Sequence, residues 1–432
     1  MASYSEILDR IYNLRGGIID LRLDRMYRAL ALFDHPQNAY PSIHIAGTNG
    51  KGSTAAMLHR ILSDAGYRTA LYTSPHLTSF TERIRVDNQE IAQNDVLLIA
   101  EQIWQQSEAA GVPLTFFEFV TLMAFVYFAR HHVDIAVIEV GLGGRLDATN
   151  VVKPLVAAIT TISKDHEAYL GPDEISIARE KGGIIKPGMP LVCGKLSDEI
   201  LDVVGGIACE RGSPVYSLGR NFSFSLKDGG LFDYTGIKHH FLNVELALAG
   251  RHQRANAAVA LAVLELVQGR FPVDEATIRA GLRRVHWPGR LEVITQGRAT
   301  VILDGAHNPE GIRALVDELQ ELRRGRKVKL LFAAMADKEW ELMLRVLAEA
   351  VDEIVFTKVD MERSADPELL AAKNQRIAHR VIGDSRRALQ TLLAEATEDD
   401  VVVVAGSLYL IGEVRPILQE GVVPAGTLED SQ

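Results

Sequence analysis

The sequence is poor in cysteine, and this scarcity excludes a fold held together by disulfides. Its 432 residues include two cysteines, Cys193 and Cys209. Neither has a cysteine or histidine nearby at the spacing of a metal site. Because disulfide frameworks belong to oxidising compartments, we expect both thiols to be packing residues and the protein to work in the cytoplasm.

A hydrophobic run long enough for a membrane anchor is also missing. Residues 1–14 carry Glu6, Asp9 and Arg10 instead of the apolar centre of an export signal. The apolar stretch from Phe119 to Ala129 is too short to span a bilayer. We therefore expect no signal peptide and no association with a membrane.

The chain lacks an excess of positive charge, because its formal net charge is -10. A sequence-independent nucleic-acid surface needs a basic stripe that displaces counterions. The nearest approach is Arg323-Arg324-Gly325-Arg326-Lys327, and such a run is typical of a solvated loop. We expect no nucleic-acid partner, and anionic ligands would have to be bound by local clusters.

A glycine-rich stretch, Gly47 to Ser53, stands between an apolar run and a helical pattern at 55–65. Such a turn points backbone N–H groups at phosphate oxygens, and a lysine adds a mobile positive charge. The spacing departs from the common pattern, because Gly47 is too close to Gly50 and Gly52 follows Lys51. A tight turn with a solvated lysine would explain the glycines but not the Lys-Gly-Ser-Thr order. We interpret the stretch as a phosphate cradle.

Apolar runs rich in Val and Ile alternate with helical patterns along the chain, which predicts parallel sheets covered by helices. The length exceeds what one core serves, so we expect two α/β domains. The first, residues 1–292, is a P-loop-type domain with a mostly parallel sheet, and the second, residues 293–432, is smaller and Rossmann-like. The second has no G-x-G-x-x-G motif, so its pattern alone does not indicate a dinucleotide. The expected strands are 68–73, 134–140, 155–162, 299–303, 328–332, 353–356 and 401–405, the expected helices include 94–109, 116–130, 174–185 and 254–267, and residues 215–242 are expected to form an antiparallel patch.

Four polar residues stand at or beyond the ends of expected strands, where an open α/β sheet binds its ligands. They are Ser74, Glu139, His166 and, in the next helix, Lys181. Each has a structural alternative, because Glu139 could form a buried salt bridge, His166 a structural hydrogen bond and Ser74 a helix N-cap. Beside a phosphate cradle, however, a hydroxyl, a carboxylate and an imidazole favour a site for a divalent ion carried in by nucleotide phosphates.

The second half contains Asp304-Gly305-Ala306-His307-Asn308-Pro309 where an expected strand gives way to a helix. Asn308 as the N-cap and Pro309 at the first helical position would explain two of these residues. Capping does not explain the presence of Asp304 and His307. This edge of the second sheet is therefore a further candidate for ligand binding.

Taken in order, these motifs resemble those of the folylpolyglutamate synthases and dihydrofolate synthases, within the Mur ligase superfamily. The resemblance covers nearly the whole chain. It is carried by Gly47 to Ser53, Thr73-Ser74-Pro75-His76-Leu77, Glu82-Arg83-Ile84-Arg85, Phe117-Glu118-Phe119, Glu139 to Asn150, Asp165-His166, Glu180-Lys181, Pro288-Gly289-Arg290, Asp304 to Pro309 and Gly406-Ser407-Leu408-Tyr409.

The resemblance implies a monomeric ligase that uses ATP and Mg²⁺, at two metal sites, to join L-glutamate to dihydropteroate or to reduced folates. An acyl phosphate would form first, and the glutamate amine would then attack it. Lys51, Lys181 and His307 would take part in catalysis. The implied ATP site is Thr48, Asn49, Gly50, Lys51, Gly52, Ser53, Asn256, Arg290 and Asp304. The implied metal ligands are Ser74, Glu139, His166 and Lys181, the last N-carboxylated to a carbamate. The implied pterin pocket is Asp20, Leu21, Thr115, Phe116, Phe117, Glu118, Leu146, Asp147 and Ala148.

Two residues depart from the family pattern. Arg22 stands where a relative has glycine, next to the pterin loop. Gly182 replaces a common alanine beside Lys181, and glycine inside a helix is less favourable than alanine by roughly 1 kcal/mol.

Two other functions remain as alternatives. A Mur-type ligase acting on a UDP-linked muramoyl substrate would share the cradle and the metal site, but usually carries a further N-terminal domain. About forty residues precede Ser42, fewer than a domain of usual size needs. A nucleotide-binding regulator with slow ATPase activity would not need the cluster from Asp304 to Pro309.

Overall fold

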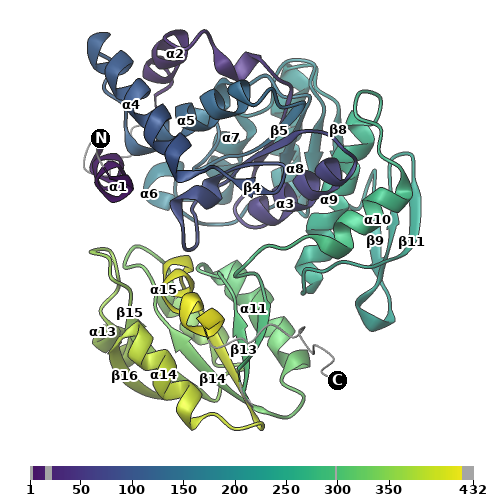
Figure 1. Cartoon of the computed structure of the whole chain (residues 1–432). Coiled ribbons are helices and arrows are strands. Elements are labelled where there is room, and N and C mark those ends of the chain that lie inside the picture. The colour runs from purple at the N-terminus through teal and green to yellow at the C-terminus, as the bar shows by residue number, and fades with distance from the viewer. Residues whose placement is uncertain (1–2, 15–21, 297–298, 421–432) are drawn as a thin grey trace, which may run out of the picture. The chain divides into compact units, whose positions relative to one another are not determined.

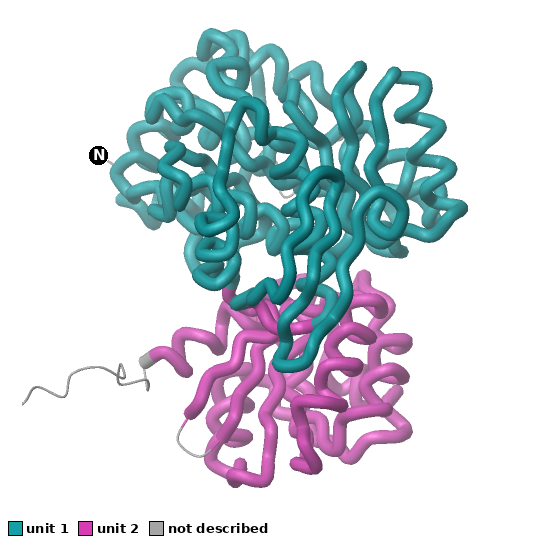
Figure 2. Tube along the Cα trace, turned by 90° about the vertical axis from the view of Figure 1, so that its right-hand side faces the viewer, with its two compact units in different colours: residues 1–247, 251–287 teal, residues 248–250, 288–432 magenta. Residues whose placement is uncertain are grey.

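The computed structural model describes residues 3–14, 22–296 and 299–420 (Figure 1). Asp20 and Leu21 lie outside these described residues. The chain divides into two compact units, coloured separately in Figure 2. Unit 1 comprises Met1–Ala247 and Arg251–Trp287, and unit 2 comprises Leu248–Gly250 and Pro288–Gln432. Each unit is an α/β structure with its own sheet, which confirms the expected fold class.

Unit 1 is built on an eight-stranded sheet in which six strands run parallel. Strand β1 is central, with β5 on one side and β6 on the other. The chain therefore adds strands in opposite directions on the two sides of β1. Open sheets bind ligands at such a switch point. The order is β4 (Gln89–Glu90), β3 (Ile84–Val86), β2 (Thr69–Tyr72), β5 (Ile135–Glu139), β1 (Ser42–Ala46), β6 (Val156–Ile159), β7 (Leu191–Cys193) and β8 (Val215–Ser217).

Helices cover both faces of this sheet, as continuous apolar strands require. Every residue of β1 and of β5 is buried. One core joins Tyr72 and Ile138 to α4 and α5, and another joins Ile159 and Leu191 to α7 and α8. The helices are α1 (Tyr4–Tyr12), α2 (Asp24–Ala31), α3 (Lys51–Asp64), α4 (Gln93–Ala109), α5 (Phe116–Arg130), α6 (Glu167–Leu170), α7 (Glu174–Gly182), α8 (Asp198–Glu210), α9 (Arg251–Val267) and α10 (Glu275–Arg284).

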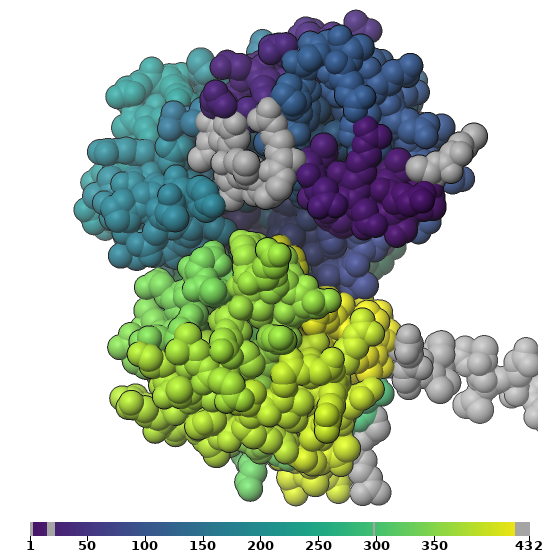
Figure 3. Space-filling view, turned by 90° about the vertical axis from the view of Figure 1, so that its left-hand side faces the viewer, coloured from purple at the N-terminus to yellow at the C-terminus, as the bar shows by residue number. Residues whose placement is uncertain are grey.

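Helix α1 lies at the surface of unit 1, where Figure 3 shows it in purple. Ser3 and Glu6 form a capping box at its start. Arg10 places its guanidinium 3.9 Å from the centre of the Trp104 ring and pairs with Glu108 at 2.8 Å. These contacts attach α1 to α4. No helix in the described ranges combines the length and the apolarity needed to cross a membrane.

The antiparallel patch expected at 215–242 is only partly correct. Strands β9 (Ser223–Leu226), β10 (Phe232–Thr235) and β11 (His240–Val244) form a separate three-stranded antiparallel sheet. Residues 215–217, in contrast, form β8 and pair in parallel with β7. Tyr234 and Phe232 fill the core beneath the small sheet.

Unit 2 contains a six-stranded sheet whose strands are parallel except for the edge strand β12. Strands β12 and β16 were not predicted from the sequence. The order is β12 (Glu292–Gln296), β13 (Ala299–Leu303), β17 (Asp400–Ala405), β14 (Lys327–Phe332), β15 (Glu353–Lys358) and β16 (Ala378–Asp384), and the helices are α11 (Pro309–Leu322), α12 (Trp340–Leu347), α13 (Pro367–Lys373), α14 (Ser385–Glu395) and α15 (Leu408–Glu420).

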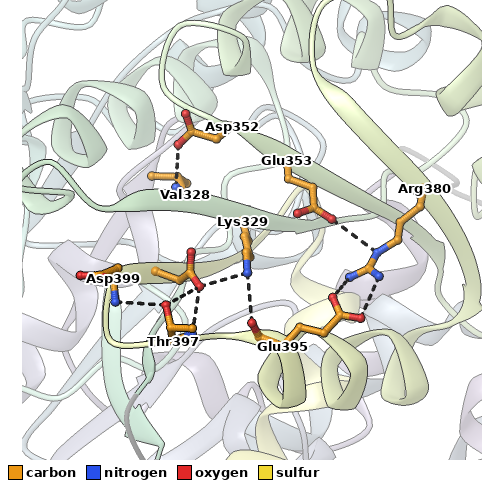
Figure 4. A network of polar contacts seen from close by, with 9 residues as sticks. Val328, Lys329, Asp352, Glu353, Arg380, Glu395, Thr397 and Asp399 are labelled. Atoms are coloured by element: carbon orange, nitrogen blue, oxygen red, sulfur yellow. Dashed lines mark hydrogen bonds and ion pairs between the residues drawn. The ribbon is translucent and has the colours of Figure 1, made fainter.

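A network of charged side chains ties α14 to this sheet (Figure 4). Lys329 donates to Asp400 at 3.0 Å and to the carbonyl of Glu395 at 3.2 Å. Arg380 binds the Glu395 carboxylate through two nitrogens and lies 3.5 Å from Glu353. A forked guanidinium suits such bidentate pairing. The network thus fixes the end of α14 at the start of strands β14, β15 and β17.

Candidate active site

The glycine-rich stretch forms a loop between β1 and α3, at the switch point of the first sheet. Gly50 caps α3 with φ +88°, and Gly47 has φ +149°, so both positions favour glycine. Space is restricted too, because a Cβ on Gly47 would lie 1.9 Å from Thr160 Oγ1. A Cβ on Gly50 would lie 2.3 Å from Asn256 Oδ1. Both glycines are therefore needed for conformation and for close approach.

The end of β6 holds the loop in place. Thr48 N donates to Thr161 O at 2.8 Å, and Asn49 N donates to Thr161 Oγ1 at 3.0 Å. Thr160 Oγ1 donates to Asn49 O at 2.6 Å. Thr160 and Thr161 were not predicted as site residues, because more than a hundred residues separate them from the loop in the sequence. Their strand-end position was the available signal.

Two lysine side chains converge on the carbonyl oxygen of Gly47. Lys51 Nζ donates to it at 3.0 Å and to Thr48 O at 3.1 Å. Lys181 Nζ donates to it at 2.9 Å. Two ammonium groups on one oxygen repel each other unless an anion joins them or one loses its proton. The loop is therefore suited to a highly charged anion.

Lys181 is 5% exposed, and its environment disfavours the ammonium form. Its pKa falls from the ordinary 10.5 to about 7, first because of burial and then because of the charge of Lys51. Asp165 and Asp147 act in the opposite direction. These influences show that Lys51, Asp165 and Asp147 all lie near the Lys181 amine.

Helix α7 is held against the turn that follows β5. Arg145 N donates to Glu180 O, and the Arg145 guanidinium pairs with the Glu180 carboxylate at 2.8 Å. The helix ends at Gly182 instead of continuing to the expected residue 185. A Cβ on Gly182 would lie 2.7 Å from Ile207 Cδ1 of α8, so a larger residue there would have to displace the end of that side chain. This arrangement directs Lys181 toward the loop.

Ser74 and Glu139, from the ends of two neighbouring strands, lie together as expected. Ser74 N–H donates to Glu139 Oε2 at 3.2 Å, and Glu139 is 5% exposed. His166 precedes α6 with φ +53°, its N–H donates to Asp165 Oδ1 at 2.8 Å, and its side chain is 36% exposed. The three side chains offer a hydroxyl, a carboxylate and an imidazole as possible metal ligands.

This donor set fits a metal ion that arrives with phosphates. In the described part of the chain, no three His, Cys, Asp or Glu side chains are grouped so that they could hold a metal by themselves. Mg²⁺ in nucleotide sites does not need such a group, because it keeps several waters and takes one or two carboxylates plus substrate phosphates. The Glu139 carboxylate and the Ser74 hydroxyl are suited to such a share of the coordination.

Asp147, expected to contact a pterin, is already engaged within its own loop. Its Oδ2 accepts from Leu142 N at 2.8 Å, and its Oδ1 accepts from Thr149 N at 2.9 Å and from Thr149 Oγ1. Burial raises the pKa of Asp147, and these hydrogen bonds oppose the shift. Asp147 also caps the short 3-10 helix Ala148–Val151, which begins with buried Ala148. It therefore fixes the conformation of residues 141–149.

The first turn of α5 contains four of the expected pocket residues, and two of them have structural partners. Thr115 and Glu118 form a capping box, in which Thr115 N donates to Glu118 Oε2 at 2.8 Å and Glu118 N donates to Thr115 Oγ1 at 3.4 Å. Glu118 also pairs with Arg25 at 3.1 Å in a nearly buried site. Phe116 and Phe117, between them, supply aromatic surface.

The two phenylalanines have different surroundings. Phe116 stacks on Tyr12 at 5.5 Å and lies 5.3 Å from the Arg83 guanidinium. Phe117 lies against Gly141, where a Cβ would approach its ring within 2.3 Å. Leu146, the remaining expected pocket residue with described structure, is partly buried.

Asn256 lies in α9, 6% exposed, and its side chain adjoins Gly50 as expected for a residue near the cradle. Its Nδ2 donates to Gln253 Oε1 at 3.1 Å. Of the expected nucleotide residues outside the glycine-rich loop, Arg290 and Asp304 belong to unit 2.

In unit 2, Arg290, Asp304 and His307 lie together at the carboxyl end of β13. Asp304 accepts from Leu291 N at 2.8 Å and from Ala306 N at 2.9 Å, so it holds the turn that carries Arg290. His307 Nδ1 bonds with Gly305 O at 2.8 Å. A Cβ on Gly305 would lie 2.0 Å from Arg290 Nη1, which explains the glycine.

The first turn of α11 follows this cluster. Asn308 accepts from Gly311 N at 2.8 Å and Pro309 begins the helix, as the capping pattern predicts. The structure thus brings Lys51 together with Lys181, and Ser74 with Glu139, in unit 1, and Arg290 with Asp304 and His307 in unit 2.

Comparison with known proteins gives consistent matches to both units. Residues 45–264 match the Mur ligase middle domain, and residues 289–408 match the Mur ligase glutamate ligase domain. The dihydrofolate synthase/folylpolyglutamate synthase of Bacillus subtilis is 34% identical over 92% of this chain and 95% of its own length. The probable bifunctional folylpolyglutamate synthase/dihydropteroate synthase of Haloferax volcanii is 35% identical over 99% of this chain, which spans 52% of that relative.

Solved structures agree with these sequence matches. E. coli FolC in complex with DHPP and ADP has a TM-score of 0.90 at 32% identity, and the match covers 97% of this chain and 98% of that one. A bifunctional folylpolyglutamate synthase/dihydrofolate synthase with Mn, AMPPNP and L-glutamate bound has a TM-score of 0.86 at 34% identity, over 96% of this chain and 98% of that one.

The fold and the two domain matches define an ATP-dependent ligase of the Mur ligase class. Identity above 30% over nearly full length then places the chain in one branch of that class: it belongs to the folylpolyglutamate synthase/dihydrofolate synthase family. The alternative of a ligase for UDP-muramoyl substrates is not favoured by these relatives.

Proposed function

We propose that this protein adds L-glutamate, with ATP and Mg²⁺, both to dihydropteroate and to reduced folates. The observation that carries the proposal is the convergence of Lys51 and Lys181 on Gly47 O, beside the pair Ser74 and Glu139. Relatives named as bifunctional enzymes support the choice of acceptors.

The reaction has to activate a carboxylate, because an anionic carboxylate without a leaving group resists attack by an amine. Transfer of the γ-phosphoryl group from ATP supplies the leaving group, and the neutral amine of glutamate then displaces phosphate. Lys51 and the N–H groups of the loop would neutralise charge on the transferred group. Arg290 and His307, from unit 2, would act on the same phosphates.

Ser74, Glu139 and His166 would hold Mg²⁺, which when bound offsets charge on the phosphates. Lys181 would serve as a further ligand after N-carboxylation. A buried lysine with a pKa near 7 is largely neutral at slightly alkaline pH, and a neutral amine reacts with CO₂. The carbamate formed would present two oxygens, which a hard cation prefers.

We propose the following division of labour. Unit 1 would bind ATP through Thr48, Asn49, Gly50, Lys51, Gly52, Ser53 and Asn256, and the acceptor through the surface near Phe116, Phe117 and Leu146. Unit 2 would contribute Arg290, Asp304 and His307. Residues 1–292 were expected to bind ATP and pterin and residues 293–432 to form the glutamate ligase part, but Arg290, within the first of these ranges, belongs to unit 2.

We further propose that the protein acts as a monomer in the cytoplasm, without nucleic-acid or membrane partners. The two cysteines are free thiols, which suits a reducing compartment. Cys193 is buried as expected of a packing residue, but Cys209 is exposed, so that expectation is wrong for Cys209.

Product mass, followed with each acceptor supplied in turn, tests the proposed function. Purified protein with ATP, Mg²⁺ and glutamate should glutamylate both dihydropteroate and tetrahydrofolate. Turnover of tetrahydrofolate alone would indicate a dedicated polyglutamylating enzyme, and turnover of neither would refute the proposal. Phosphate release should require both glutamate and an acceptor, since release without them would indicate a regulatory ATPase.

A further inference from the structure

One glycine of the cradle is not explained by the phosphate-loop pattern. Gly52 separates Lys51 from Ser53, where the common pattern has no residue. Its backbone does not adopt the left-handed conformation that requires glycine. A Cβ on Gly52 would instead lie 3.0 Å from Nε1 and 3.1 Å from Cζ2 of the Trp287 indole. The absence of a side chain at Gly52 therefore lets the indole lie close against the first turn of α3.

Trp287 reaches the cradle from the segment that follows α10. Arg284, the last residue of α10, pairs with Asp64 at the end of α3 at 2.9 Å. The chain then continues in extended conformation at Val285. Three residues after Arg284, Trp287 contacts the first turn of the same helix. This segment therefore binds α3 at both ends.

A cation fixes the indole from another side. The Arg85 guanidinium lies 5.8 Å from the centre of the Trp287 ring, within the range of a cation–π interaction. Arg85 is itself held, because it pairs with Glu90 at 3.1 Å and donates to Glu82 O at 3.3 Å. The ring thus has a defined place next to Gly52.

We propose that Trp287 is a positioning residue for nucleotide binding. Its indole sets the place of the first turn of α3, and with it the N–H groups and the Lys51 amine that face the phosphates. The inference rests on the proposed ATP binding at the cradle. Trp287 is also the last residue of unit 1, directly before Pro288 of unit 2.

Fluorescence tests this directly, because the chain has three tryptophans, Trp104, Trp287 and Trp340. In the double variant Trp104→Phe/Trp340→Phe, Trp287 is the single indole. Titration with Mg²⁺–AMPPNP should change its emission, with the same half-saturation as calorimetry on the unmodified protein. Trp287→Phe should abolish that change while Trp104→Phe leaves it. Calorimetric binding without an emission change would overturn the inference about Trp287 but not the proposed function. Absence of calorimetric binding would overturn the proposed function as well.

Kinetics separate positioning from general stability. Trp287→Leu should raise the KM for ATP about tenfold and lower kcat much less than Lys51→Ala does, because it displaces the groups of the cradle without removing them. Trp287→Phe, which keeps an aromatic ring, should recover most of the loss. Trp104→Phe is the matched control. Equal KM values for Trp287→Leu and the unmodified protein would contradict the proposal.

A double-mutant cycle probes the contact itself. Gly52→Ala alone should raise the KM for ATP, because the added methyl meets the indole. In the Trp287→Leu background the same change should add little, since that ring is gone and leucine is smaller. Fully additive losses would show that the two residues act independently and would refute the assignment.

Discussion

Lys51 and Lys181 donate to a single acceptor, the carbonyl oxygen of Gly47, at 3.0 and 2.9 Å. The two residues are 130 positions apart in the sequence, yet their amines share one oxygen at the centre of the cradle. Their mutual repulsion is part of what lowers the pKa of Lys181. The pair therefore makes the loop both attractive to phosphate and unusually sensitive to the protonation of one amine.

Removing the first of these charges should abolish ligation without unfolding the protein. Lys51→Ala deletes a partly buried amine that packs in no hydrophobic core, and loss of one such stabilising donor lowers kcat on the order of 100-fold or more. Lys195→Ala, at an exposed lysine, is the control. Activity and thermal unfolding should be measured on both. Lys51→Ala with activity like that of Lys195→Ala would rule out the cradle assignment.

Glu139→Gln keeps the size of the side chain and an oxygen that can accept from Ser74 N–H. We expect it to fold normally but to need at least tenfold more Mg²⁺, since even outer partners of metal ligands matter by about that factor. The Mg²⁺ concentration at half-maximal activity is the measurement. If it equals that of the unmodified enzyme, Glu139 is a structural residue.

The activity of the enzyme should depend on CO₂, because Lys181 has to be carboxylated. Its pKa of about 7 means that the amine becomes neutral, and able to react, as pH rises through that value. Enzyme prepared without CO₂ should be weakly active and recover with bicarbonate, more completely at pH 8 than at pH 6. Lys181→Ala should be inactive at either pH. Carbon NMR in ¹³C-bicarbonate should show a carbamate signal that Lys181→Ala lacks, and its absence from an active enzyme would disprove carboxylation.

Acid should destabilise unit 1 through His44. Burial lowers the pKa of this histidine from 6.5 to about 3, with a smaller contribution from Lys186. Below pH 6.5 the unfolded chain binds the proton more readily, so stability falls with decreasing pH until about pH 3. The loss is about 1.4 kcal/mol per pH unit, or roughly 2 kcal/mol at pH 5.

Denaturant unfolding of His44→Gln between pH 7 and pH 5 measures this contribution. In the variant, the free energy of unfolding should depend on pH less steeply, by the binding of about one proton. His239→Gln, at an exposed histidine, is the matched control. An unchanged slope in His44→Gln would show that this histidine is protonated in the folded protein.

Gly141→Ala should impair the acceptor site selectively. Its methyl would come within 2.3 Å of the Phe117 ring and displace it. We expect the KM for dihydropteroate to rise about tenfold while nucleotide binding stays within about twofold. Phe117→Leu in the same background should relieve the clash. Equal effects on both substrates would instead indicate a general distortion of the loop after β5.

Local patterns predicted the parallel sheets and the cradle because both leave their signal within one short stretch. Strands β1 and β5 are buried on both faces and are read as continuous apolar runs. The edge strands β12 and β16 escaped prediction for the opposite reason. Their residues are mostly exposed or partly buried, so no apolar run marks them.

The partners of the site residues could not be predicted, since they come from distant parts of the chain. Thr160 and Thr161 hold the loop, Arg25 neutralises Glu118, and Trp287 packs on Gly52. Asp147 shows the limit most clearly. The family resemblance implies that this carboxylate contacts a pterin, and that contact stays a prediction. The fold shows that backbone N–H groups of the chain already donate to both carboxylate oxygens.

A buried series of hydrogen bonds connects the strand before the cradle to the loop of Asp147. His44 Nε2 bonds to Thr149 Oγ1 at 2.8 Å, and that hydroxyl in turn donates to Asp147. An amide or alkyl group at Asp147 would leave backbone N–H groups without their acceptor and disturb the wall beside His44. Engineering of acceptor selectivity should therefore leave this carboxylate in place. Libraries built at Phe116 and Leu146 would alter the proposed acceptor site and leave the hydrogen bonds between His44, Thr149 and Asp147 in place.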